Sequence, residues 1–173
     1  QIKTQSFIWN TFIPFSKQLP VMDCCIQGFL HVFGSIFKKI NGVVNCLDVN
    51  VNPGGCSWLH AIVQIDKQAE DDGKNAIQAA FAGHRSCKHV FVVDKDIDIY
   101  NPQEVEWAMA TRFQGNVDMV VKDKEPGSSL DPSAETGTKM TTKIGFDLTK
   151  PVGTTSFDKA PFPEVDLSRF IEE

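Results

Sequence analysis

The chain has 173 residues, 42% hydrophobic and 23% charged, values typical of one soluble globular domain with a substantial core. Its formal net charge of -5 and sequence pI of about 5.3 exclude general nucleic-acid binding, which requires a basic surface. No apolar run is long enough to span a bilayer, and five cysteines without a C-x-x-C pair predict reduced thiols in a cytoplasmic protein.

The N-terminal stretch is apolar but broken by prolines. Residues 1–20 contain aromatic side chains such as Trp9 and Phe12, together with Pro14 and Pro20, which interrupt any long helix. We expect this extension to pack on the domain or on a missing neighbour, and residues 21–173 to form a single α/β domain. A chain without an initiator Met also fits a fragment of a longer protein.

The first half of the domain alternates helical and extended patterns. Apolar residues recur at helical spacing over residues 21–40, and extended patterns cover residues 43–51 and 58–65. The intervening turn allows these two strands to pair as a hairpin. Residues 66–83 follow as a helix with small apolar side chains on one face. A strand on either side of this helix would make a βαβ crossover.

The centre of the chain is an apolar strand followed by acids. Residues 89–93 are rich in Val and aromatics, which predicts a buried strand. Asp94, Asp96 and Asp98 come next at alternate positions. If the extended conformation continues, these three carboxylates share one side, because strand side chains alternate.

A capped helix follows the acids. Asn101 is a good N-cap, Pro102 suits the first helical position, and Glu104 stands where a capping box needs it. One face of this helix is expected to pack on the domain, and its members are Val105, Ala108, Met109 and Arg112.

The last third is expected to add strands and one long loop. A helix over residues 102–113 and a strand over 117–121 repeat the earlier pattern. Residues 122–140 are polar and predict a loop, residues 141–148 a strand, and residues 165–173 a short terminal helix. The predicted fold is α/β, with a mixed, partly parallel sheet flanked by helices and containing βαβ units.

The alternating aspartates are the obvious candidate for a metal site, since hard cations prefer carboxylate oxygens. An EF-hand loop starting at Asp94 fails, because Ile99 and Val105 occupy the positions that need Gly and Glu. Asp94-x-Asp96 also has the form of the metal motif of glycosyltransferases. The favoured interpretation is structural: Asp98 and Asn101 cap the next helix, and the other acids accept hydrogen bonds.

Basic residues precede the central strand. His84, Cys87 and His89 could be drawn as zinc ligands, but strand alternation separates their side chains and no second half of a site exists. Arg85 and Lys88 make a phosphate contact more plausible, and a solvated turn more plausible still. The sequence contains no G-x-S-x-G, Walker or G-x-G-x-x-G motif, so it holds no complete active site.

Several segments in combination resemble one enzyme family. The stretch VVDKDIDIYNPQEVEWAMATRF at residues 92–113 resembles the C-terminal domain of the UbiD family, the prenylated-FMN-dependent reversible decarboxylases. Residues 51–65, 127–133 and 143–147 resemble the turn, later loop and later strand of that domain. The resemblance covers about residues 30–150.

This resemblance implies a function shared with another part of the protein. It implies a non-oxidative decarboxylase of aromatic or α,β-unsaturated acids, with prenylated FMN, a divalent metal and the catalytic acids in an upstream flavin-binding domain. The family's E-G-P-F-G-[ED] segment is absent here, so this chain is expected to bind neither cofactor and to be inactive alone. It would be the oligomerising domain that closes over the flavin domain.

Two loop residues are the predicted contacts with the substrate pocket. By position, Ser128 and Leu130 match the family segment that lines the substrate pocket, and Leu130 would be the closing side chain. Two alternatives stay open: a non-catalytic oligomerisation module, and a metal-dependent glycosyltransferase using Asp94 and Asp96.

Overall fold

A computed structural model describes residues 20–51 and 53–160 of the chain. The predicted extension, except for Pro20, and the predicted terminal helix lie outside these residues. The elements in chain order are α2 (Pro20–Ile40), β1 (Cys46–Asn50), the 3-10 turn η1 (Pro53–Gly55), β2 (His60–Ile65), α3 (Asp72–Gly83), β3 (His89–Asp94), α4 (Pro102–Arg112), β4 (Met119–Pro126) and β5 (Met140–Asp147).

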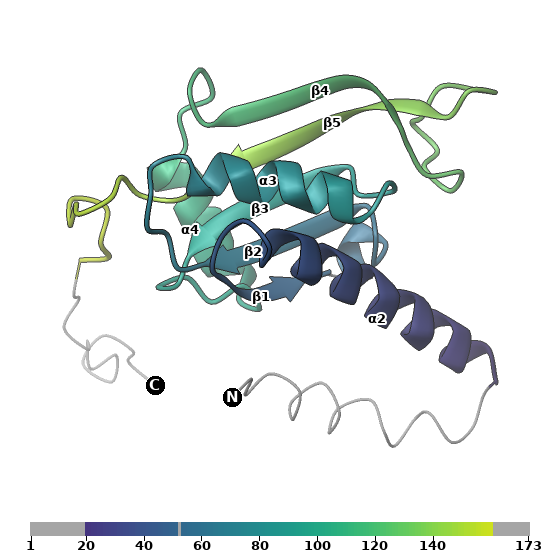
Figure 1. Cartoon of the computed structure of the whole chain (residues 1–173), viewed down its shortest axis with the longest axis horizontal. Helices are drawn as coiled ribbons and strands as arrows, with labels where there is room; N and C mark the ends of the chain where they lie inside the picture. The colour runs from purple at the N-terminus through teal and green to yellow at the C-terminus, as the bar shows by residue number, and fades with distance from the viewer. Residues whose placement is uncertain (1–19, 52, 161–173) are drawn as a thin grey trace, which may run out of the picture.

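The strands form one five-stranded sheet in the order β1-β2-β3-β5-β4 (Figure 1). β1 and β2 pair antiparallel, as the predicted hairpin requires. β2 pairs parallel with β3 and β3 parallel with β5, while β4 and β5 are antiparallel. The prediction of an α/β fold with a mixed, partly parallel sheet is therefore confirmed.

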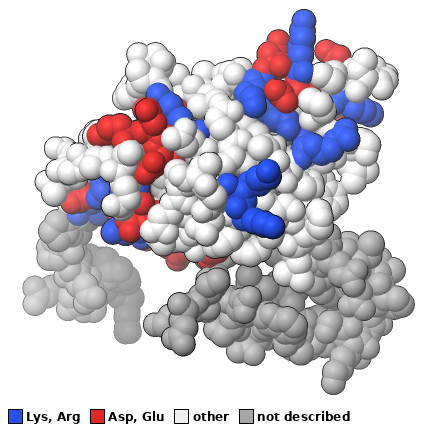
Figure 2. All heavy atoms as spheres, viewed as in Figure 1, with Lys and Arg blue, Asp and Glu red and all other residues white. Residues whose placement is uncertain are grey.

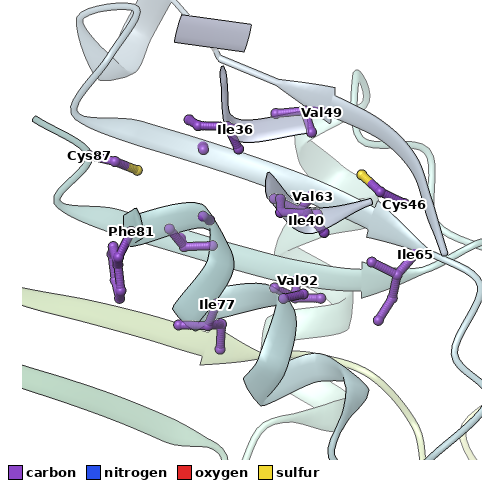
Figure 3. Packing of buried hydrophobic residues seen from close by; sticks show 14 of the residues in the cluster. Ile36, Ile40, Cys46, Val49, Val63, Ile65, Ile77, Phe81, Cys87 and Val92 are labelled. Atoms are coloured by element: carbon purple, nitrogen blue, oxygen red, sulfur yellow. The ribbon is translucent and has the colours of Figure 1, made fainter. Parts of the chain in front are cut away.

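One face of the sheet is covered by α2 and α3. Alternate residues of β2 and β3 point to this side, and Val63, Val90 and Val92 have no exposed surface. Ile36 and Ile40 of α2 close the core over β1 and β2, and Figure 3 shows them beside the strand valines. This layer is built from the apolar stripe of α2 and from the small residues of α3, which let the helix approach closely.

The opposite face is covered only in part. Ile62 of β2, Val93 of β3 and Leu148 pack with Ile97 and Ile99 of the turn after β3 and with Ala108 of α4. These residues form a second, smaller cluster toward the carboxyl ends of the parallel strands. The prediction that Ala108 and Arg112 face inward is confirmed, whereas Met109 is exposed.

Several boundaries differ from the predictions. α3 begins only at Asp72, because the preceding residues form a turn in which the Asp72 carboxylate accepts the backbone N–H groups of Gln68 and Ala69. β4 extends to Pro126, so part of the predicted 122–140 loop is strand. Pairing with β5 holds these polar residues extended, which the local composition did not indicate.

The repeated βαβ pattern was wrong in its last step. β4 is not the neighbour of β3; β5 lies between them and pairs with both. The second strand of the β4–β5 hairpin pairs with β3. Gly145 lies on the face that α3 covers, and Phe146 lies on the opposite face beside Phe91.

Candidate functional site

Asp94, which ends β3, and Asp96 in the following turn converge on a buried arginine of α4. Arg112 has a side chain with no exposed surface, and its Nη1 donates to Asp94 Oδ2 at 3.3 Å and to Asp96 Oδ1 at 3.1 Å. Its Nη2 donates to Asp96 Oδ2 at 2.7 Å. The guanidinium also lies 5.0 Å from the ring centroid of Trp107. Two carboxylates are thus balanced by one planar cation in a nearly water-free position.

The same cluster holds the segment that follows β5. The backbone N–H of Lys150 donates to Asp94 Oδ2 at 2.8 Å, and Arg112 Nη2 donates to the carbonyl of Phe157 at 3.1 Å. Lys150 Nζ lies 3.5 Å from Asp96 Oδ2 and pairs with Asp158. The acids therefore tie β3, α4 and residues 149–158 together, as the structural interpretation predicted.

Burial and pairing shift these acids in opposite directions. Burial raises the pKa of Asp94, although its hydrogen bond from Lys150 and the nearby Arg112 oppose this. The hydrogen bonds from Arg112 lower the pKa of Asp96, which is more exposed. Both effects are those of a structural ion pair, and within residues 20–51 and 53–160 no three His, Cys, Asp or Glu side chains are grouped as metal ligands. The glycosyltransferase alternative loses its support here.

The side chain of Asp98 does not join Asp94 and Asp96 at Arg112, because β3 ends at Asp94 and a turn follows. Its carboxylate accepts the N–H of Tyr100 at 2.9 Å, and the Asn101 side chain accepts the N–H of Gln103 at 3.1 Å. Glu104 accepts the N–H of Asp98 at 2.8 Å rather than that of the N-cap. The expectation that the three aspartates share one side was wrong, whereas the capping role of Asn101 is confirmed.

A shallow hollow of about 230 Å³ lies beside this cluster, at the carboxyl ends of β2 and β3. Its charged lining is mixed and includes Asp66, Lys67 and Lys95. Lys67 Nζ is occupied by Thr149 Oγ1 at 3.0 Å and by the carbonyl of Lys150 at 3.1 Å. The hollow therefore presents ion pairs rather than a free nucleophile or base.

The loop between β4 and β5 contains the two predicted pocket residues. Ser128 is buried, and its Oγ accepts the backbone N–H of Leu130 at 3.2 Å. Leu130 is 67% exposed. The serine thus shapes the loop from within, while the leucine is available to contact something outside this chain.

The loop is fixed to the start of β3 by an ion pair that sequence reasoning missed. Lys88 Nζ donates to Asp131 Oδ2 at 2.8 Å and also to Ser133 Oγ. Although burial opposes it, the hydrogen bonds from Lys88 and Ser133 lower the pKa of Asp131 to about 2. Lys88 stood in the predicted basic cluster, but nothing local indicated a partner forty-three residues further along the chain.

The remaining residues of that basic cluster do not converge. Cys87 is buried in the core under α2 and α3, where burial raises the pKa of its thiol to about 12. His89 contacts the ring of His60 on the other face of the sheet. His84 ends α3, and its buried Nδ1 has no hydrogen-bond partner among the described residues. Strand alternation separates the drawn zinc ligands, as expected.

Comparison with known proteins decides the family. The model of the 3-octaprenyl-4-hydroxybenzoate carboxy-lyase C-terminal domain, UbiD_C, matches residues 27–148. The chain belongs to this family. The UbiD resemblance stated from the sequence is thereby confirmed.

Characterised relatives of this UbiD domain are decarboxylases. The chain is 49% identical over 126 residues to anhydromevalonate phosphate decarboxylase of Methanocaldococcus jannaschii. The aligned region covers 72% of this chain and 30% of that protein. It is 53% identical over 104 residues to the enzyme of the same name from Aeropyrum pernix, covering 60% of this chain and 23% of that protein. The chain thus spans less than a third of the curated relatives it matches.

Solved UbiD structures share the fold. The UbiD-class enzyme HmfF from Pelotomaculum thermopropionicum, solved in complex with FMN, aligns with a TM-score of 0.73 and 32% identity over 85% of this chain and 33% of that one. The 3,4-dihydroxybenzoic acid decarboxylase AroY of Klebsiella pneumoniae aligns with a TM-score of 0.70 and 28% identity, over 80% and 31% of the two chains.

No helix within the described parts of the chain is both long and apolar enough to cross a membrane.

Proposed function

We propose that this chain is the C-terminal domain of a UbiD-type carboxy-lyase that removes carbon dioxide from a phosphorylated, non-aromatic acid. The support is the 49% and 53% identity to anhydromevalonate phosphate decarboxylases, against 36% to the gallate decarboxylase of Lactiplantibacillus plantarum. The sequence analysis predicted an aromatic or an α,β-unsaturated acid as substrate, and the higher identity favours the non-aromatic class.

The chemistry is assigned to an upstream flavin-binding domain, which would hold prenylated FMN and a divalent metal. The residues described here do not fit either group. Asp94 and Asp96 are engaged by Arg112, and the hollow beside them is lined by paired charges. Binding of the flavin and the metal is therefore assigned to the upstream domain rather than to the described residues of this chain.

The contribution of this domain is to close the substrate pocket and to assemble the enzyme. Leu130 is exposed in a loop that the ion pair between Lys88 and Asp131 holds in place, which supports its role as the closing side chain. The partners are the upstream domain and further copies of the protein, and the free buried thiols Cys46 and Cys87 support a cytoplasmic location.

The charges on the visible face are divided between two regions. Figure 2 shows acidic side chains gathered near the N-terminal end of α3, and basic side chains interspersed with acidic ones over β4 and β5. The loop that carries Leu130 joins β4 and β5 in this region of mixed charge. The proposal of a phosphorylated substrate therefore rests on the identity to the anhydromevalonate phosphate decarboxylases.

A chimera tests the proposal directly. Residues 27–148 would replace the matching domain of the M. jannaschii enzyme, and release of carbon dioxide from anhydromevalonate phosphate would be measured. We expect the chimera to be active and its Leu130→Asp variant to lose at least tenfold in kcat/KM. Val43→Asp, at another exposed apolar residue, is the matched control.

Two results would contradict the proposal. One is a folded, flavin-loaded chimera whose Leu130→Asp variant keeps full activity. The other is decarboxylation by the purified 173-residue chain alone, because the division of labour assigns every catalytic group to the upstream domain.

A further inference from the structure

The loop between β4 and β5 is attached to the parallel part of the sheet by one lysine. Lys88, the residue before β3, donates from Nζ to Asp131 Oδ2 at 2.8 Å and to Ser133 Oγ. Asp131 Oδ1 in turn accepts the backbone N–H and the hydroxyl of Ser133. The side chains of Lys88 and Asp131 are only 17% and 4% exposed. Water and salt therefore weaken this ion pair less than an ion pair on an open surface.

The other hydrogen bonds described for residues 127–139 stay within the β4–β5 hairpin. At the base of the loop, for example, the N–H of Gly127 donates to the carbonyl of Lys139 at 2.9 Å. The residues of both hydrophobic core clusters lie outside this loop. The contact with Lys88 is therefore the polar contact that fixes the loop relative to β3.

Leu130 lies between two buried residues of the same loop. Ser128 is 6% and Asp131 3% exposed, whereas Leu130 is 67% exposed. The Ser128 hydroxyl accepts the N–H of Leu130 at 3.2 Å, and the Ser128 carbonyl accepts the N–H of Asp131 at 3.2 Å. Because adjacent Cα atoms are about 3.8 Å apart, a shift of Asp131 moves the leucine with it.

We propose that Lys88 is a positioning residue, which acts through Asp131 to hold Leu130 where it closes the substrate pocket. This inference rests on the proposed function, in which Leu130 is the closing side chain, and it names the residue that controls the closure. A side chain that is already held in its binding position loses less conformational entropy when it packs on a ligand. The fixed loop therefore raises the fraction of the enzyme that is competent to close.

Removal of the lysine ammonium group should loosen the loop and leave the fold intact. It leaves the Asp131 carboxylate buried without its cation, which is unfavourable. Movement of the loop into water relieves this cost, and no residue of either core cluster has to move with it. The effect of losing Lys88 should therefore appear first in the order of the loop and in the closure by Leu130.

Hydrogen exchange on the 173-residue chain tests the loosening. The amides of Leu130, Asp131 and Ser133 are hydrogen-bonded within the loop. We expect them to exchange about tenfold faster or more in the Lys88→Met variant, while the amides of β3 exchange at the wild-type rate. Lys88→Arg should keep the exchange slow, because arginine retains the positive charge.

The matched control is Lys122→Met. It removes another lysine charge, but Lys122 pairs with Glu125 inside β4. This variant should exchange like wild type in the loop. Wild-type exchange in the Lys88→Met loop overturns the proposal, and so does equal acceleration by Lys122→Met, because the attachment to β3 would then not be the cause.

A double-mutant cycle in the chimera tests whether Lys88 acts through Leu130. Lys88→Met and Leu130→Ala should each lower kcat/KM by about fivefold or more, and the double variant should fall little below the weaker single variant. A purely structural role of the lysine would give two effects that multiply, which overturns the positioning role. Thermal unfolding of the four proteins verifies that each is folded at the assay temperature.

The outcomes separate this inference from the proposed function. An inactive but folded and flavin-loaded chimera overturns the proposed function, and faster loop exchange in Lys88→Met still supports the attachment of Leu130 through Lys88. An active chimera in which Lys88→Met exchanges and reacts like wild type overturns this inference alone.

Discussion

At the scale of single residues, Arg112 makes the interactions that join the acids at the end of β3 to the rest of the domain. It balances Asp94 and Asp96, donates to the carbonyl of Phe157, and lies over Trp107. An uncompensated carboxylate in this position would be costly, because burial already raises the pKa of Asp94.

Replacing this arginine should destabilise the domain. Arg112→Leu leaves the buried Asp94 without its cation, and we expect a loss of about 3 kcal/mol in the free energy of unfolding, measured by urea denaturation. Asp96→Asn is the control and should cost about 1 kcal/mol, because Asp96 is more exposed. Equal effects of the two variants would show that the buried charge is not the cause.

Two neighbouring histidines, His60 of β2 and His89 of β3, make stability depend on pH. Burial, together with the neighbouring His89, lowers the pKa of His60 below its usual 6.5. Burial and Lys88 likewise lower the pKa of His89, while the nearby Asp131 opposes this. Below pH 6.5 the unfolded chain therefore binds more protons than the folded one, so stability is lost as pH falls through the folded pKa values.

Urea unfolding at pH 7.5 and pH 5.5 tests whether the free energy of unfolding falls on acidification. We expect a lower free energy of unfolding at pH 5.5 and a smaller pH effect in the His60→Gln/His89→Gln variant. Stability that rises on acidification of the wild-type chain would contradict the assignment, unless the double variant showed the same rise.

At the scale of elements, the contact between α3 and β5 depends on the absence of a side chain. A Cβ built on Gly145 would lie 2.2 Å from Cγ2 of Ile77, which is fully buried in the core of Figure 3. Helix and strand therefore approach more closely than two ordinary side chains would allow. The close contact lets α3 pack against both β3 and β5.

Adding one methyl group at this contact should separate the two elements. We expect Gly145→Ala to cost about 2 kcal/mol by overpacking. Adding Ile77→Ala should recover part of that loss, so the two changes should be less than additive in thermal or urea unfolding. Strict additivity would mean that the two residues do not meet as described.

At the scale of the whole molecule, residues 149–158 close the carboxyl ends of the strands. Lys67 holds Thr149 and the carbonyl of Lys150, Asp94 holds the N–H of Lys150, and Arg112 holds Phe157. One crossing segment thus joins the turn after β2, the end of β3 and α4. This segment lies beyond the family match, which ends at residue 148.

Removing this segment should leave a folded but weaker domain. We expect a chain that ends at Leu148 to lose about 3 kcal/mol, because several hydrogen bonds to charged groups disappear together. Its circular dichroism should remain that of an α/β protein. The comparison is with a chain that ends at residue 160, and equal unfolding midpoints of the two would contradict the closing role.

The sequence by itself determined α2, α3, α4, the central strand and the Asn101 cap, because periodicity and capping act within a few residues. The UbiD family was identified from the resemblance of several segments in combination. It also indicated that the acids are structural. Only the tertiary structure decided that Asp94 and Asp96 share Arg112, that Lys88 fixes the Asp131 loop, and that β5 lies beside β3. Those contacts join residues far apart in the chain, and their pairing depends on which faces meet in space rather than on any local pattern.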